Sequence, residues 1–299
     1  MFFHRAAHPS ADTTAVVASA AGTRTLLYSL VILIVTGGIQ IIIVYVSGSL
    51  ALFADTLHNF SDALTSIPLW IAFRLALLPP TRRFTLGYGR FEDLAGVLIL
   101  LIILFSAGVC TYESIMRLLY PQPITHLGWV VLAAIVGFLG NEWVARIRLK
   151  TGREMNSAAL IADGQHARID AWTSLAVLGS SLGVILGFPI IDTVVGLGMS
   201  AMILYIVWES GKSILLQLLD GVDPKVVDQI LRILAESHIS PKAVHDVRVR
   251  WVGHVMQAEL HIHFPPTESI GEIPKLQHRL LHRFQEDFPS LKSLSIVAI

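Results

Sequence analysis

The sequence has little charge of either sign and almost no cysteine. Of its 299 residues only 15% are charged, and the 22 basic residues balance the 22 acidic ones, so the formal net charge at pH 7 is zero. Without a basic excess there is no long-range field to attract nucleic acid, which disfavours nucleic-acid binding. The single cysteine, Cys110, stands in an apolar run, so it forms no internal disulfide and supplies no metal site by itself.

Apolar residues dominate instead. Hydrophobic residues make up 54% of the chain, and the mean hydropathy of +0.64 is too high for a soluble domain of this size, which indicates an integral membrane protein. A membrane-spanning helix needs about 20 mostly apolar residues. We therefore predict an α-helical membrane protein with six transmembrane helices, at about residues 26–46, 50–78, 94–119, 127–147, 157–186 and 190–208.

The polar segments around these helices predict the domain limits and the orientation. Residues 1–24 lack the compact apolar core of a signal peptide and are predicted to be a flexible tail, followed by a transmembrane domain at 25–212. Cytoplasmic loops are enriched in Lys and Arg. Because the basic residues gather in the tail and in the second and fourth connections, we expect a multi-pass protein of the plasma membrane with both termini in the cytoplasm; these residues are Arg5, Arg24, Arg74, Arg82, Arg83, Arg90, Arg146, Arg148, Lys150 and Arg153.

The last part of the chain, residues 213–299, is more polar and is predicted to be a small cytoplasmic domain. Its segments alternate between helical periodicity and strand-like alternation in the order αββαβ. This order predicts an α+β layer domain of ferredoxin-like type, with two helices on one face of a small sheet.

A repeated motif runs through two of the predicted spans. Residues 51–66 and 159–174 share the pattern A-L-x-A-D-x-x-H-x-x-x-D-A-x-T-S at an offset of 108 residues. In the predicted topology the second and fifth helices run in opposite directions, so the repeats are inverted. Inverted repeats are typical of secondary transporters, whose sites lie where the two halves meet.

The repeat places ionisable side chains on one face of each helix, because positions i, i+3 and i+7 share a face. Exposing a carboxylate to lipid at the bilayer centre costs about 2.5 kcal/mol or more, so such residues usually face a cavity and mark an ion path. A single His/Asp pair could equally be a hydrogen-bonded packing group. Two matching pairs favour one shared tetrahedral site that suits zinc, with the metal ligands His58, Asp62, His166 and Asp170.

The first aspartate of each repeat is predicted to have a supporting role. Asp55 and Asp163 each lie one helical turn from a His/Asp pair. Each could hold the histidine in one tautomer or pack between helices, and we favour this over direct ligation.

The segments "SLALFADTLHNFSDAL" and "ADGQHARIDAWTSLAVL", with six helices and a small α+β tail, closely resemble the cation diffusion facilitator family of divalent-metal/proton antiporters. The resemblance implies that the four ligands named above form the transport site, and that a homodimer exports the metal in exchange for protons. Metal is then the substrate, with no prosthetic group and no enzymatic activity. His58 resembles the zinc-type members, whereas members with Asp at that position more often carry iron, cadmium or manganese.

Two regions depart from the family pattern. The connection "PPTRRFTLGYGRFED" has Phe84 and Tyr88 where some members have metal-binding histidines, so a second site is expected to be absent there. Its arginines, Arg90 included, are predicted to face lipid headgroups, with Glu92 and Asp93 as partners.

In the cytoplasmic domain, His245 and His261 match positions that hold metal in some members. The C-terminal ligand segment of those members is replaced by "LSIVAI", so a cytoplasmic metal site stays an open possibility.

Other functions remain as alternatives at this point. An intramembrane zinc hydrolase needs an open metal position and a general base, but the sequence has no His-Glu-x-x-His segment. A non-transporting metal sensor would bind metal without moving it. Zinc, iron, cadmium, cobalt and manganese all stay open as the metal, because selectivity depends on geometry and supply as well as on ligand type.

Overall fold

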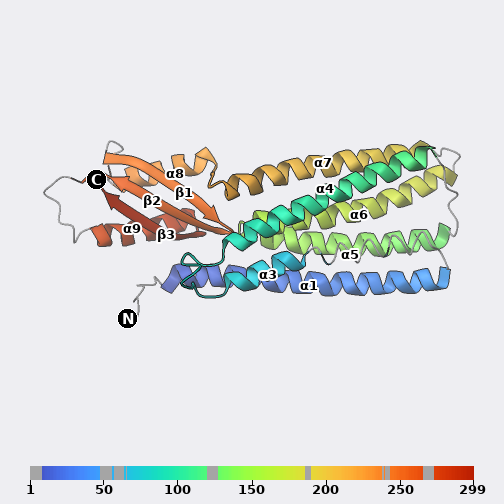
Figure 1. Cartoon of the computed structure of the whole chain (residues 1–299), viewed down its shortest axis with the longest axis horizontal. Coiled ribbons are helices and arrows are strands. Elements are labelled where there is room, and N and C mark those ends of the chain that lie inside the picture. The colour runs from blue at the N-terminus through green and yellow to red at the C-terminus, as the bar shows by residue number, and fades with distance from the viewer. Residues whose placement is uncertain are drawn as a thin grey trace.

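The computed structural model describes residues 9–47, 56, 64, 66–119, 127–185, 190–237, 239, 243–264 and 273–299. Figure 1 shows an elongated bundle of helices with a small domain of helices and strands at one end of it. Helix α1 begins and strand β3 ends at that same end. The start of α1 and the end of β3 are therefore close to each other along the long axis of the molecule.

The bundle contains long apolar helices. It is built from α1 (Pro9–Ser47), α3 (Ile67–Ala76), α4 (Arg90–Leu119), α5 (Leu127–Glu154), α6 (Ala158–Ile185) and α7 (Ile190–Leu218). Among the described residues, four segments are long and apolar enough to cross a membrane: Val16–Ser47, Arg90–Tyr112, Gly128–Glu154 and Val194–Leu218. Helix α6 has 28 residues but carries Asp163, Arg168 and Asp170, and it is not among these four.

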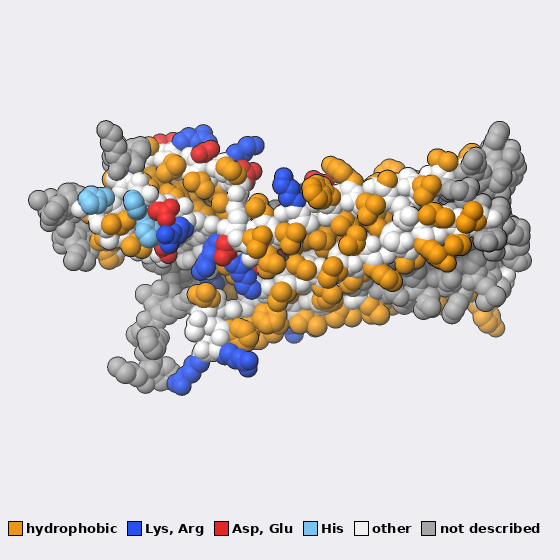
Figure 2. Space-filling view, turned by 45° about the horizontal axis from the view of Figure 1, so that its top comes forward, with side chains coloured by type: hydrophobic (Ala, Val, Ile, Leu, Met, Phe, Trp, Pro, Cys, Tyr) orange, Lys and Arg blue, Asp and Glu red, His pale blue; other side chains and the backbone are white. Residues whose placement is uncertain are grey.

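The outer surface of the bundle is apolar. Figure 2 shows hydrophobic side chains along the length of the bundle, whereas charged side chains gather at the small domain and where it meets the helices. Large side chains such as Tyr45, Phe105 and Trp208 are exposed by 74% to 88%. A surface of this kind would be costly in water and is suited to lipid.

Helices α5 and α6 form a close antiparallel hairpin. Ser157 caps the N-terminus of α6, because its hydroxyl accepts a hydrogen bond from the backbone N–H of Leu160 at 3.1 Å. A Cβ added at Gly152 would lie 2.9 Å from the side chain of Ile161 and 3.0 Å from its backbone nitrogen. The absence of a side chain at Gly152 therefore lets the two backbones approach.

The C-terminal domain has the predicted order αββαβ. Its elements are α8 (Pro224–Glu236), β1 (Val244–Val252), β2 (Val255–Ile262), α9 (Ile273–Asp287) and β3 (Leu291–Ala298). The strands form a sheet in the order β1-β2-β3, in which β1 and β2 are antiparallel and β2 and β3 are parallel. Burial alternates along β2, so one face of the strand packs in a core that both helices share, through Ile230, Leu234, Leu260 and Phe284 among others.

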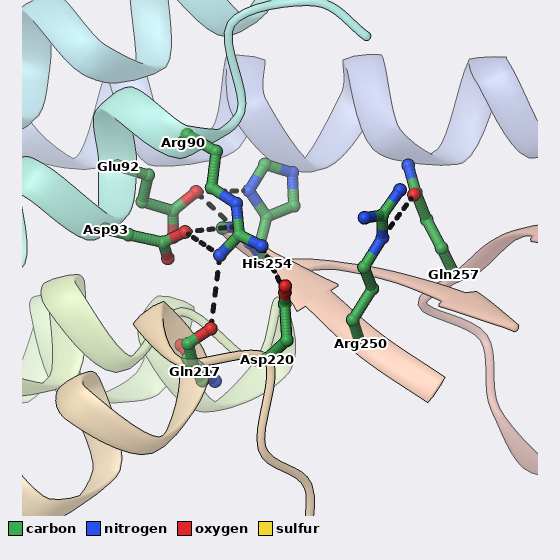
Figure 3. A network of polar contacts seen from close by, with 9 residues as sticks. Arg90, Glu92, Asp93, Gln217, Asp220, Arg250, His254 and Gln257 are labelled. Carbon is green, nitrogen blue, oxygen red and sulfur yellow. Dashed lines mark hydrogen bonds and ion pairs between the residues drawn. The ribbon is translucent and has the colours of Figure 1, made fainter. Parts of the chain in front are cut away.

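The turn between β1 and β2 inserts into the end of the bundle. His254 at this turn has 5% of its surface exposed, and its Nδ1 lies 2.7 Å from Oε2 of Glu92 at the start of α4. The backbone N–H of His254 donates to the same oxygen at 3.2 Å. On α1, Oγ of Ser19 lies 3.3 Å from Nε2 of His254. Figure 3 shows this buried histidine beside Glu92. Polar contacts thus join the two parts of the molecule.

Gly253 is required for this docking. Its φ of +61° belongs to the left-handed region, and a Cβ there would lie 2.5 Å from Oε2 of Glu92. The backbone N–H of Gly253 also donates to Oδ2 of Asp93 at 3.4 Å. A residue with a side chain would have to displace Glu92 from His254.

The prediction that Arg90 faces lipid headgroups is wrong. Its guanidinium group donates to Oδ2 of Asp93 at 3.2 Å and to the carbonyl oxygen of Gln217 at 3.1 Å, and it pairs with Asp220 (Figure 3). The predicted pairing with Asp93 is found, whereas Glu92 contacts His254. Arg90 therefore ties the start of α4 to the end of α7.

The structure differs from the sequence-based prediction at both limits of the transmembrane domain. Residues 9–24, expected in a flexible tail, form the first part of α1, and α7 continues to Leu218, past the limit expected at residue 212. The extension of α1 brings Ser19 to His254, so this part of the chain contributes to the domain junction.

Replacing Gly152 by Leu is expected to destabilise the bundle by about 1–3 kcal/mol or more, because the added side chain meets backbone atoms of α6. Gly198 on α7 is the matched control, since a Cβ there has nothing within 4 Å. Thermal melting of the detergent-solubilised protein, followed by size-exclusion chromatography, should separate the two variants. Equal melting temperatures would contradict the close α5–α6 contact.

Replacing Gly253 by Ala is expected to release the β1–β2 turn from the bundle. Amide hydrogen exchange of the turn should become faster, because the backbone N–H of His254 loses its buried acceptor. The control is Gly87→Ala, which puts the same residue at a φ of +87° where the nearest atom is 3.9 Å away. If both variants leave exchange at the turn unchanged, the turn is not held by this contact.

Candidate functional site

Helix α6 carries the second copy of the repeat and gathers its predicted site residues on one face. Asp163 and His166 are buried, with 0% and 3% of their surface exposed. Oδ1 of Asp170, one turn beyond His166, lies 3.9 Å from Nδ1 of that histidine. The structure thus places an imidazole and a carboxylate close together on α6.

Ser66 links the end of the first repeat to the second. It is the last residue of the first repeat, it precedes α3, and it is buried. Its hydroxyl lies 3.2 and 3.3 Å from the two carboxylate oxygens of Asp163, so it can donate to either one. The other predicted residues of the first repeat, Asp55, His58 and Asp62, lie outside the described residues.

Asp163 also has a cationic partner. Nη1 of Arg148 on α5 lies 3.0 Å from Oδ2 of Asp163, and 2% of the arginine side chain is exposed. The sequence places Arg148 among the basic residues of a cytoplasmic connection, whereas the structure places it in the bundle interior. Asp163 therefore forms a buried ion pair that counting charges along the chain does not reveal.

A second ion pair joins α5 and α6. Oε2 of Glu142 lies 3.5 Å from Nε of Arg168, and Oε1 accepts from Nε of Arg146 at 2.7 Å. Glu142 and Arg168 were not among the predicted site residues. The signal that could have identified them is their charge inside predicted spans: Glu142 stands in residues 127–147, and Arg168 stands in residues 157–186.

The side chains on α6 supply the chemistry of half a metal site. A neutral imidazole nitrogen and a carboxylate oxygen are both ligands for zinc and related divalent cations. Within the part of the chain that the structure describes, no three His, Cys, Asp or Glu side chains are grouped closely enough to hold a metal. His166 and Asp170 are the two described members of the predicted set of four.

The two histidines singled out in the C-terminal domain lie on paired strands. His245 is exposed on β1, and His261 on β2 has Nε2 at 2.6 Å from Oε1 of Glu259. Arg248 on β1 lies between Glu259 and Asp246, and its hydrogen bond to Asp246 lowers the pKa of that carboxyl group. The described surroundings of His261 are thus a chain of charged side chains along the sheet.

The connection between α3 and α4 is packed by aromatic side chains. The ring of Phe84 lies 4.9 Å from Tyr88 and 5.9 Å from Phe91, measured between ring centroids. The hydroxyl of Tyr88 lies 3.4 Å from Oγ1 of Thr81. Phe84 and Tyr88 therefore stabilise the loop by packing against each other.

Comparison with known proteins gives a family match over most of the bundle. The family described as the cation efflux transmembrane domain matches residues 26–219. A probable cation efflux system protein of Mycobacterium tuberculosis is 47% identical over 293 residues, which cover 97% of this chain and 88% of the relative. Two more distant relatives are the magnetosome protein MamB of Magnetospirillum gryphiswaldense, 27% identical over 84% of each chain, and the zinc transporter ZitB of Escherichia coli, 25% identical over 96% of this chain and 92% of the relative.

The matched region includes both copies of the repeat and the helices that bury His166, Asp163 and Arg148. The relative of Mycobacterium tuberculosis extends the likeness through the C-terminal domain as well. The chain therefore belongs to the cation efflux family of membrane transporters, also called the cation diffusion facilitators.

Proposed function

We propose that this protein is a secondary active transporter that exports a divalent metal, with zinc favoured, from the cytoplasm in exchange for protons. The observation that carries the proposal is the buried hydrogen bond between Ser66 and Asp163, because it joins a residue of the first repeat to a residue of the second. Zinc is favoured by the His and Asp ligand types, and one relative is named a zinc transporter. Iron, cadmium and manganese are the alternative cargoes.

The proposed metal site combines both repeats. Asp62 precedes Ser66 by four residues, and His166 follows Asp163 by three, so each lies one helical turn from the contact between the repeats. If the first repeat is helical and antiparallel to α6, as its sequence predicts, we expect Asp62 near the level of His166 and His58 near that of Asp170. Four ligands would then surround one ion.

The rest of the architecture is proposed on the same basis. The first repeat with α3 would form the second of six spans, and α6 would form the fifth. The bundle end that carries the C-terminal domain would face the cytoplasm, because α5 ends there with Lys150 and Arg153. As in the family that the sequence resembles, the chain would act in the plasma membrane as a homodimer.

Proton exchange follows from the ligand chemistry. Metal ligands must be deprotonated, so a metal ion can bind His166 only when one ring nitrogen is free of its proton. Histidine has a reference pKa of about 6.5, so its protonation changes within the physiological range. His58 and His166 would bind protons when the metal leaves, and rocking of the two halves would expose the site to each side in turn. Transport is favoured over hydrolysis, since the matched family is one of cation efflux.

Replacing His166 by Ala is expected to abolish metal transport and metal-coupled proton flux together. The loss should exceed the about 10–100-fold effect of removing an outer partner of a metal ligand, because a direct ligand is removed. The assay is uptake by reconstituted vesicles with a panel of divalent metals and a pH-sensitive dye inside.

His282→Ala provides the matched control for this assay, since His282 is 77% exposed on α9 of the C-terminal domain. The control should transport like the unmodified protein. Proton flux that still follows metal in the His166→Ala variant would refute the assignment of His166.

A further inference from the structure

We propose that Arg148 is a built-in counter-cation for Asp163, which keeps this aspartate out of the transport site. The two side chains form one neutral unit, so Asp163 neither binds the metal nor carries a proton during transport. Arg148 is then a positioning residue. It contacts Asp163, which lies one helical turn from His166, and it thereby sets the net charge beside the site. This inference rests on the function proposed above.

The burial of the pair carries the first step. The side chains of Arg148 and Asp163 have 2% and 0% of their surface exposed, and Nη1 lies 3.0 Å from Oδ2. A buried charge without a partner is strongly unfavourable. Among the residues that the structure describes, Asp163 is contacted by one charged side chain, Arg148, and by one hydroxyl, that of Ser66. Arg148 is therefore the described group that balances the charge of Asp163.

The packing of the hairpin fixes the pair in place. A Cβ added at Gly164 would lie 3.0 Å from Cβ of Arg148 and 3.0 Å from the backbone nitrogen of Leu149. The two helices are thus in close contact beside the ion pair. Nε and Nη2 of Arg148 have no hydrogen-bond partner among the described residues, so its described polar contact is the one to Asp163.

The repeat has an arginine at this position in one half only. The offset of 108 residues relates Asp163 to Asp55, and it relates Arg148 to Gln40 on α1. The hairpins correspond, because α1 ends at Ser47 and α5 ends at Glu154. Gln40 is buried with 1% exposed, and its Nε2 donates to the carbonyl oxygen of Ala133 at 3.3 Å. A neutral amide therefore stands where the other half has a cation.

This asymmetry has a consequence for the charge of the site. The two His-x-x-x-Asp pairs are the same in both repeats, but the residue equivalent to Arg148 in the other half, Gln40, carries no charge. On the α6 side, Arg148 neutralises the charge of Asp163, so the metal ion meets no additional negative charge there. On this side, the metal ion therefore leaves the site without the attraction of a third charged carboxylate.

The test is a rescue experiment in reconstituted vesicles, with zinc as the probe and the full chain in every variant. Asp163→Asn leaves the buried cation of Arg148 unbalanced beside the site, so the apparent KM for zinc should rise about tenfold or more. Adding Arg148→Met removes that cation. The double variant should recover the KM and the protons exchanged per metal of the unmodified protein, to within about threefold for the KM.

Asp170→Asn is the matched control, because Asp170 is a proposed ligand on the same helix. Its transport defect should persist when Arg148→Met is added. A double variant Asp163→Asn/Arg148→Met that transports as poorly as Asp163→Asn alone would overturn the proposal, since Asp163 would then act on the metal or the proton itself.

Three further outcomes can be told apart in the same experiment. If a single variant fails to accumulate in the membrane, the double variant compared with the unmodified protein still decides, because both lack an unbalanced charge. Absence of zinc transport by the unmodified protein in the same vesicles, with transport of other divalent metals also absent, would refute the proposed function instead. Normal transport by Asp163→Asn alone would also overturn the proposal, because an unbalanced cation would then have no effect.

Discussion

The structure depends on one constraint: an ionised side chain inside an apolar bundle must have a partner of opposite charge or a bound ion. On α5 and α6 the pairs of Arg148 with Asp163 and of Glu142 with Arg168 satisfy this condition within the protein. His166 and Asp170 lie 3.9 Å apart on α6, and their side-chain types are ones that bind divalent metals. The candidate site therefore differs from the two arginine–carboxylate pairs in the chemistry of its side chains.

Much of the architecture follows from composition and periodicity. Long apolar runs predict the spans of α1, α4, α5 and α7, because lipid requires about 20 apolar residues of any helix that crosses it. The period of 3.6 residues places Asp163, His166 and Asp170 on one face of α6. The αββαβ order is confirmed for the C-terminal domain, since alternation along β2 marks the face that packs in the core.

Other features depend on contacts between segments far apart in the sequence, which periodicity does not report. The charge pattern groups Arg148 with the loop arginines, because orientation rules use position along the chain. Its burial depends instead on the direction in which its side chain leaves α5. The contact of Glu92 with His254 joins residues 162 positions apart. Likewise, Ser19, in the part of α1 that precedes the predicted span, contacts His254 of the C-terminal domain, a partner that the local sequence does not identify.

The short helix α3 gives the site and the domain junction a physical connection. At its start, Ser66 binds Asp163; toward its end, the ring of Phe73 lies 6.1 Å from the ring of His254, edge to face. Phe73 is completely buried, so α3 moves little without repacking its surroundings. Withdrawal of His254 from the bundle would remove a contact of the helix that begins at the site. The position of the C-terminal domain and the arrangement around Asp163 are therefore mechanically linked through ten residues of helix.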